Sequence, residues 1–327
     1  MFSKLIGNGL AKDILSSIVI KKAFPHALLF SGPSGVGKRQ FALTLAKAIL
    51  GNEHARKIDG SLHPDVRVFY PEGKSGMHLL SSIHQMQQQM AVEPFEAKSR
   101  VFIIDQAHKM PAASSNALLK TLEEPPEGNY LILLTHQPEE ILPTIHSRCR
   151  KIPFFSIGDK EISLLLQSGY AKTEVEAKKL AYLSYGSIGQ ALFLMKDASE
   201  SRPAIVAQIL STPPFNPLRH SALVSQLEEH IIAHEEEASR FYAQIDLFFE
   251  EIYYWYRDLH LLSAAVDPSL LFHFDSLSLL EPLSRHPLVS LEEVDLYIRQ
   301  AKTAIDRGMK IRYVFEYLLM SLMAARD

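Results

Sequence analysis

A glycine-rich stretch ending in lysine has the residue types and the spacing of a phosphate-binding loop. Residues 32–39 read GPSGVGKR and fit the pattern G-x-x-x-x-G-K. In such loops backbone amides surround a phosphate, glycine lets it approach the backbone closely, and the lysine reaches the outer phosphates of a nucleotide. The following helix directs its positive end at the charge. The candidate nucleotide-binding residues are Gly32, Pro33, Ser34, Gly35, Val36, Gly37, Lys38 and Arg39.

The last position of this motif argues against nucleotide hydrolysis. In working P-loop enzymes a serine or threonine there ligates Mg²⁺. Arg39 is cationic and has no acceptor atom, so it cannot replace that ligand. The alternative, a glycine-rich turn without any ligand, fits less well, because an apolar run comes before the loop and a helical pattern follows it.

A second motif, VFIIDQAH over residues 101–108, places Asp105 at the carboxyl end of an expected buried strand. A Walker B aspartate at such a position holds Mg²⁺. The next residue is Gln106, where hydrolysing proteins carry a glutamate that polarises the attacking water, and an amide cannot accept a proton. His108 has a ring that could act as a base, but we expect a surface residue at the start of a helix.

Apolar runs alternate with amphipathic patterns through the first half of the chain. This alternation is typical of an α/β fold with a mostly parallel sheet covered on both faces. After residue 155 the sequence shows helical periodicity alone, and the aromatic residues of 248–259 recur at the spacing of a packed helix face. The pattern predicts strands over 27–32, 101–105 and 130–135, and helices over 10–19, 39–50, 79–92 and 112–124.

The composition is that of a soluble globular protein of two or three domains, with 327 residues, 47% of them hydrophobic. The net charge of −3 provides no overall cationic field to hold a polyanion. The single cysteine, Cys149, excludes an internal disulfide and a multi-cysteine zinc site, and we expect it to be structural. The sequence shows no signal-peptide pattern at its start and no apolar run of about 20 residues. We therefore expect a cytoplasmic protein that does not contact a membrane.

Residues 116–149, NALLKTLEEPPEGNYLILLTHQPEEILPTIHSRC, resemble the signature of the bacterial clamp-loader ATPase family of DNA polymerase III. The loop, LHPDVRVFYPEG and VFIIDQAHKM accompany it in the family's order across residues 20–155. The resemblance implies an AAA+ fold in three domains. These are a RecA-like nucleotide-binding domain over 1–155, a helical lid over 156–205, and a helical collar that mediates oligomerisation over 206–327.

Three further residues acquire roles only through this resemblance. Arg148, in the sequence SRC, matches the arginine finger that such subunits insert into a neighbouring subunit's nucleotide site. The alternative is an arginine that caps a loop by a salt bridge. Thr135 matches the sensor position that detects the outer phosphate. Gln190, in GSIGQAL, stands where active relatives usually carry a sensor arginine, so a cationic contact to the nucleotide is lost.

The resemblance implies a subunit that does not hydrolyse ATP itself and is not a polymerase. Its expected partners are the other clamp-loader subunits in a hetero-oligomeric ring and, through that ring, the sliding clamp and primed DNA. ATP or ADP could be held without hydrolysis. No zinc is expected, since the four-cysteine module of many relatives is missing, and His54 and His63 are expected at the surface. The alternatives are an ATP-hydrolysing motor subunit of the same loader, another P-loop ATPase, and a small-substrate P-loop kinase, for which no arginine-rich lid is evident.

Overall fold

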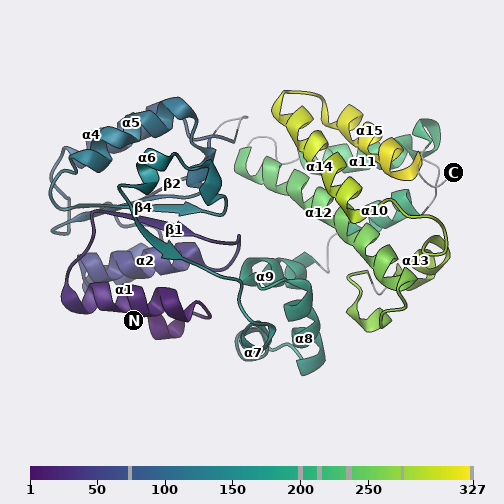
Figure 1. Ribbon diagram of the computed structural model, residues 1–327, viewed down its shortest axis with the longest axis horizontal. Helices are drawn as coiled ribbons and strands as arrows, with labels where there is room; N and C mark the ends of the chain where they lie inside the picture. Colours follow the sequence, from purple (N-terminus) through teal and green to yellow (C-terminus); the bar gives the residue numbers. More distant parts are fainter. Residues whose placement is uncertain (73–75, 198–201, 212–215, 233–237, 274–275, 325–327) are drawn as a thin grey trace. The chain divides into compact units, whose positions relative to one another are not determined.

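The computed structural model describes residues 1–327 except 73–75, 198–201, 212–215, 233–237, 274–275 and 325–327 (Figure 1). The chain forms two compact units, Met1–Lys196 and Asp197–Asp327. In the part of the chain described, no helix is long and apolar enough to cross a membrane.

The first unit is built on a five-stranded sheet in the order β2-β3-β4-β1-β5, with every neighbouring pair parallel. The expected α/β fold with a parallel sheet is confirmed. Two short strands at the edges of the sheet, β2 and β5, were not predicted from the sequence. The strands are β1 (Ala27–Ser31), β2 (Val66–Phe69), β3 (Arg100–Ile104), β4 (Asn129–Thr135) and β5 (Arg150–Pro153).

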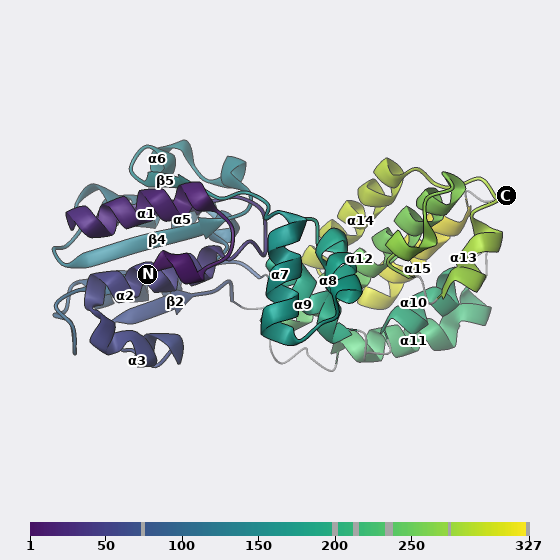
Figure 2. The same cartoon turned by 90° about the horizontal axis from the view of Figure 1, so that it is seen from below.

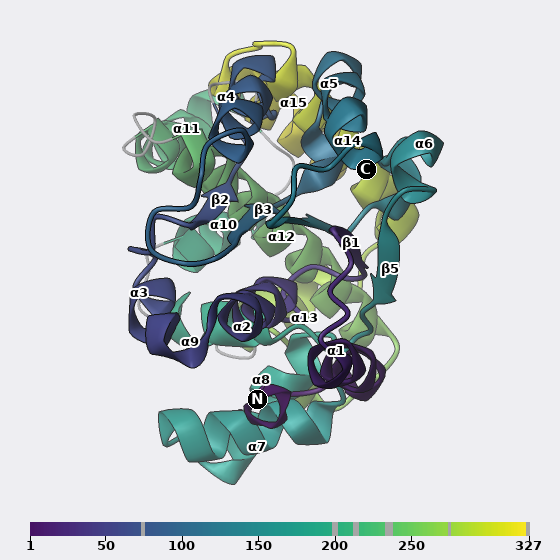
Figure 3. The same cartoon turned by 90° about the vertical axis from the view of Figure 1, so that its left-hand side faces the viewer.

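Helices cover both faces of this sheet, as Figures 1 and 3 show. Alternate residues of β4 serve the two faces: Ile132 packs in the cluster beneath α1 and α2, and Leu133 in the cluster beneath α4 and α5. Cys149 is buried in the latter cluster, where burial raises the pKa of its thiol to about 12, which fits a structural role. One face carries α1 (Gly9–Lys21), α2 (Lys38–Leu50) and α3 (Ala55–Asp59), and the other α4 (Leu80–Met90), α5 (Ala112–Glu123) and α6 (Pro143–His146).

Three helices complete the first unit: α7 (Asp159–Tyr170), α8 (Glu174–Leu183) and α9 (Ile188–Asp197) (Figure 2). Helix α8 begins at a capping box, in which Thr173 and Glu176 satisfy each other's backbone N–H groups. These helices fall within the expected lid. The boundary expected at residue 205 lies inside α10 (Arg202–Leu210), whereas the compact units divide at Lys196. The division into three domains stays a prediction.

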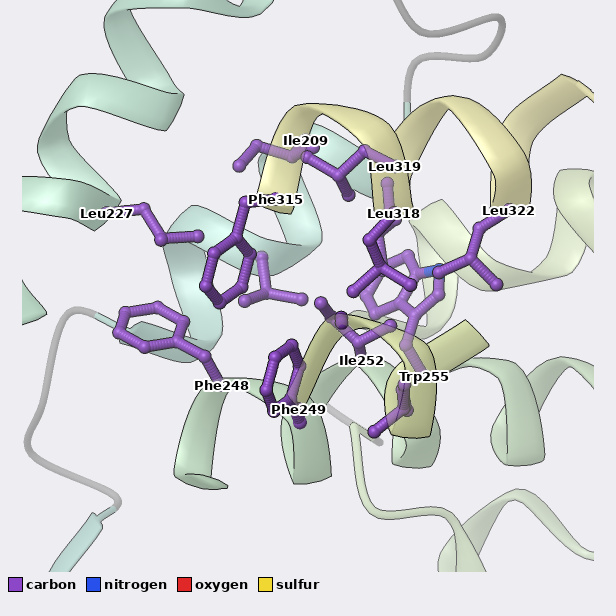
Figure 4. Packing of buried hydrophobic residues seen from close by; sticks show 14 of the residues in the cluster. Ile209, Leu227, Phe248, Phe249, Ile252, Trp255, Phe315, Leu318, Leu319 and Leu322 are labelled. Carbon is purple, nitrogen blue, oxygen red and sulfur yellow. The ribbon is translucent and has the colours of Figure 1, made fainter. Parts of the chain in front are cut away.

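All the elements described in the second unit are helices, as expected. Its core lies between α12 and α15, where Phe249 stacks on Phe315 with ring centroids 5.2 Å apart (Figure 4). The aromatic residues Phe248 and Trp255 are also fully buried here, so their helical spacing reflects core packing. Besides α10, this unit contains α11 (Pro217–Ile232), α12 (Ala238–Ser263), α13 (Leu277–Leu283), α14 (Leu291–Asp306) and α15 (Ile311–Ala324). The 3₁₀ helices are η1 (Phe2–Lys4), η2 (Asn52–His54), η3 (Ala107–Lys109), η4 (Pro138–Glu140) and η5 (Pro268–Leu270).

Candidate functional site

The glycine-rich loop connects β1 to α2 at the carboxyl edge of the sheet. The Gly32 N–H donates to the carbonyl of Thr135, at the end of β4, across 3.2 Å. A Cβ at Gly32 would collide with the carbonyl oxygen of Phe154, and its φ of 149° disfavours other residues. Gly37 has a φ of 92° and leads directly into α2. Glycine is therefore needed at both ends of the loop.

The side chain of Lys38 lies back over the loop. Its Nζ donates to the carbonyl oxygens of Gly32 and Pro33, each at 2.6 Å. Burial lowers the pKa of Lys38 to about 8, and the nearby charge of Asp105 partly opposes this shift. The lysine thus lies over the loop and in the electrostatic field of Asp105, and its contact with a phosphate stays a prediction.

Arg39 packs against an aromatic ring that the sequence patterns had not assigned a role. Its guanidinium lies 5.1 Å from the ring centroid of Tyr70, the residue that follows β2. The Nε of Arg39 is buried without a hydrogen-bond partner. Burial raises the pKa of Tyr70, with the positive charge of Arg39 acting in the opposite sense. A cation stacked on an aromatic ring therefore occupies the position at which a P-loop hydrolase carries its Mg²⁺ ligand.

Asp105 and Gln106 follow β3 at the same edge of the sheet. An oxygen of the Asp105 carboxylate accepts the Gln106 N–H at 2.9 Å, and Gln106 itself has a left-handed backbone with φ 52°. The Asp105 backbone carbonyl lies 2.7 Å from Nε2 of His78, which donates to it. This network fixes the turn after β3, so Asp105 is held beside the loop with an amide as its neighbour.

Thr135 is buried and bonded to His108. Its hydroxyl accepts the Gln137 N–H at 3.0 Å and is hydrogen-bonded to Nδ1 of His108, 3.2 Å away. Burial, together with the neighbouring His136, lowers the pKa of His108 to about 3. The expectation that His108 lies at the surface is wrong, because it packs under the end of β4. A neutral ring whose Nδ1 is already bonded is a poor general base.

The amino terminus of α9 contacts the loop directly. The Gly189 N–H donates to the carbonyl of Gly35 at 2.9 Å, and a Cβ at Gly35 would collide with the Ser187 hydroxyl. That hydroxyl also accepts the Gln190 N–H at 3.1 Å. The structure therefore brings Gln190 close to the loop, where a sensor residue would be expected.

Arg148 does not join this group. Its Nη2 donates to the Glu123 carboxylate at 2.6 Å, and its Nη1 donates to the carbonyl of Thr144 at 3.0 Å. These partners belong to α5 and α6, and none of the hydrogen bonds described for Arg148 reaches the loop. In this chain Arg148 forms a salt bridge with Glu123, and its role as an arginine finger stays a prediction.

His54, His63 and Glu96 bring ligand atoms within 4.8 Å of one another, as a metal site would. Their hydrogen bonds explain this grouping without an ion. The Asp65 N–H donates to Nδ1 of His63 at 3.0 Å, so the proton of His63 is on Nε2, which donates to His54 across 2.9 Å. The Glu96 carboxylate is paired with Lys57 at 2.6 Å. His63 is 3% exposed, so its expected surface position is wrong, while the absence of zinc stays a prediction.

Residues 7–157 match the family model described as DNA polymerase III, delta subunit. The match covers less than half of the 327 residues, and over this part the chain is similar to DNA polymerase III subunits. The chain is 34% identical over 169 residues to DNA polymerase III subunit delta′ of Bacillus subtilis, covering 49% of this chain and 48% of that protein. It is 31% identical over 229 residues to subunit gamma/tau of Mycoplasma pneumoniae, covering 64% and 33% respectively. The chain thus spans about half the length of the first relative and a third of the second.

A solved structure also resembles this chain. It is a DNA polymerase III, gamma subunit-related protein of Thermotoga maritima, with a TM-score of 0.45 and 19% identity, covering 97% of this chain and 100% of that one.

Proposed function

We propose that this chain is a delta prime-like subunit of the DNA polymerase III clamp loader that does not hydrolyse ATP itself. It supplies Arg148 to the nucleotide site of a neighbouring subunit and takes part in the ring that loads the sliding clamp onto primed DNA. The observation that carries the proposal is the replacement of hydrolytic residues around one intact loop.

These replacements affect separate parts of the hydrolytic apparatus. Arg39 removes the oxygen ligand of the metal, and Gln106 removes the carboxylate that would orient water. Gln190, close to the loop through Ser187, removes a cationic contact to the nucleotide. Metal positioning and an oriented nucleophile each contribute orders of magnitude to phosphoryl transfer, so their joint loss is expected to abolish turnover at this loop.

The role of Arg148 in a neighbouring site is supported by its chemistry and its accessibility. A guanidinium is permanently charged and binds phosphate oxygens in a bidentate manner, which suits it to stabilise a phosphoryl group from another subunit. The side chain is 34% exposed, and so is accessible from outside this chain. Its ion pair with Glu123 is exposed as well, and such pairs contribute only about 0–1 kcal/mol.

The second unit offers a surface for assembly. Helix α15 exposes Tyr313, Tyr317 and Met320, which lie on one helix face at the spacing i, i+4, i+7. Exposed apolar side chains gathered in this way often mark a protein contact. The expected occupant is the corresponding helical part of another DNA polymerase III subunit.

An ATP-hydrolysing motor subunit is the second candidate. It is favoured by one observation, the similar identity of 34% to subunit tau of Bacillus subtilis, over 173 residues that cover 49% of this chain and 30% of that protein. Under this alternative, residues elsewhere in the chain would have to replace the missing metal ligand and glutamate.

Phosphate release by the purified chain with ATP and Mg²⁺ separates these candidates. We expect the wild-type chain and the matched variant Lys38→Ala to release phosphate at the same rate. A loop that does not hydrolyse ATP has no turnover that the loss of Lys38 could reduce. Turnover in the wild-type chain that disappears in Lys38→Ala would overturn the proposal in favour of a motor subunit.

A further inference from the structure

The two adjacent cations of the loop, Lys38 and Arg39, define the chemistry of the ligand that it can take. We infer that residues 32–39 bind the polyphosphate of a nucleotide without Mg²⁺, with the guanidinium of Arg39 supplying the positive charge that a metal ion supplies in hydrolysing P-loop proteins. The inference rests on the proposed function only in treating the loop as a nucleotide site.

A magnesium ion does not fit the residues that are present. Mg²⁺ requires oxygen ligands in near-ideal octahedral geometry, and the guanidinium of Arg39 offers only N–H donors. The charge of Asp105 acts on Lys38, and the charges of Asp105 and Arg39 both act on Tyr70. A divalent cation near the Asp105 carboxylate would therefore meet repulsion from Lys38 and Arg39.

A polyphosphate does fit them. Nε of Arg39 is buried and has no hydrogen-bond partner, and a buried donor without an acceptor destabilises the folded chain. Phosphate oxygens are strong acceptors, and guanidinium–phosphate pairs are short and bidentate. Nothing lies within 4 Å of the position that a Cβ would take on Gly37, so there is space where the loop enters α2.

Tyr70 acts as a positioning residue for Arg39. The ring supports the guanidinium at 5.1 Å and follows directly after β2. The Asp105 N–H donates to the carbonyl of Phe69 at 2.9 Å, which ties the end of β2 to the end of β3. Arg39 is therefore held on the side of the loop where Asp105 lies, and not directed freely into solvent.

The internal hydrogen bonds of the loop compete with nucleotide binding. Lys38 is bonded to the carbonyls of Gly32 and Pro33, and Gly35 accepts a hydrogen bond from Gly189. A polyphosphate must displace the lysine from these carbonyls, and its binding energy must exceed what those bonds contribute. If the closed loop is the more stable state, the chain binds no nucleotide under any condition.

Calorimetric titration of the full chain with ATP, in excess EDTA and separately in excess Mg²⁺, tests the inference. We expect binding in EDTA that is at least as tight as binding in Mg²⁺. Arg39→Ser should weaken ATP binding in EDTA by about tenfold or more, which is the loss expected for a charge-assisted hydrogen bond. The same variant should bind ATP more tightly in Mg²⁺ than in EDTA. The matched control Arg67→Ser, in an exposed arginine of β2, should leave both affinities unchanged.

Three results would overturn the inference: binding that requires Mg²⁺, no binding in either condition, and wild-type affinity in a folded Arg39→Ser variant. Thermal unfolding of each variant establishes that it is folded. Tyr70→Leu provides a second test, since it removes the aromatic support and keeps the guanidinium, and it should weaken binding in EDTA less than Arg39→Ser does. None of these results bears on Arg148, whose proposed role is measured in the assembled loader.

Discussion

The Arg148 guanidinium and the Glu123 carboxylate are joined by a 2.6 Å hydrogen bond that links the connection after α6 to the end of α5. This bond does not compete strongly with a role for Arg148 elsewhere, because the two side chains are 34% and 51% exposed. Water screens such a pair, and another anion can replace Glu123 at little cost. The salt bridge and the arginine finger are therefore compatible as two states of one side chain.

Replacing Glu123 by glutamine tests this relationship. We expect the free energy of unfolding to fall by less than about 1 kcal/mol, because the pair is exposed. ATP turnover by a loader reconstituted with this variant should equal or exceed the wild-type rate, since Arg148 is released and remains charged. Urea unfolding and phosphate release measure the two effects. A loss of turnover as large as that of an Arg148 variant would mean that the pair itself is required.

Asp65 stabilises the first unit through a buried network that the sequence patterns did not reveal. Its carboxylate accepts the N–H groups of Phe95, Glu96 and Ala97 at 2.7–3.0 Å, and Nε of Arg100 at 3.2 Å. Burial favours the neutral carboxyl, but these hydrogen bonds outweigh it and lower the pKa of Asp65. We expect Asp65→Ala to destabilise the chain by about 3–5 kcal/mol, because Arg100 is left as a buried, uncompensated charge.

Denaturant unfolding measures this loss, and Asp59→Ala is a matched control. Asp59 is exposed and paired with Lys47, so its removal should cost less than about 1 kcal/mol. Equal destabilisation by the two variants would contradict the account of Asp65.

The central strands of the sheet could be predicted because they are continuous apolar runs buried on both faces. All five residues of β3 are buried, and so are five of the seven residues of β4. The edge strands β2 and β5 escaped prediction because each has four residues, most of them only partly buried or exposed. An edge strand has a neighbouring strand on one side only, so fewer of its side chains are buried. Its sequence therefore shows a weaker pattern of apolar residues.

The motif residues of the site were found because they occur at fixed spacing around predicted elements. Asp105 follows β3, Thr135 ends β4, and Lys38 begins the helix after β1. These strands are neighbours in the sheet, in the order β3-β4-β1, so the three residues lie together. The partners of these residues were not foreseen. The contacts of Tyr70 with Arg39 and of His108 with Thr135 join residues 27 or more positions apart, and no local pattern encodes them.

His273 predicts a pH dependence of stability in the second unit. Its Nε2 lies 2.7 Å from the Glu251 carboxylate and its Nδ1 lies 3.0 Å from that of Asp258, and all three side chains are buried. Burial opposes the charged ring, but hydrogen bonds to the two carboxylates raise the pKa of His273 from 6.5 to about 9. The contribution of the charged His273 ring to the free energy of unfolding is therefore fully present below pH 6.5, and it is lost as the pH rises through about 9.

The free energy of unfolding of the wild-type chain, measured in urea between pH 6 and pH 10, should include a fall of roughly 3 kcal/mol from this group. His273→Gln, which cannot become charged, should remove that dependence, so the difference between the two proteins should shrink as the pH rises. A difference that stays constant across the range would show that His273 is not charged in the folded protein.

ATP turnover by the clamp loader reconstituted with Arg148→Ala tests the central claim most directly. Arg150→Ala, a change in the neighbouring exposed arginine of β5, is the matched control, and gel filtration establishes that each complex assembles. We predict an intact complex whose neighbouring site hydrolyses ATP about 10³-fold more slowly, the contribution typical of an arginine finger. Unchanged turnover in a fully assembled Arg148→Ala complex would contradict the proposed function of this residue.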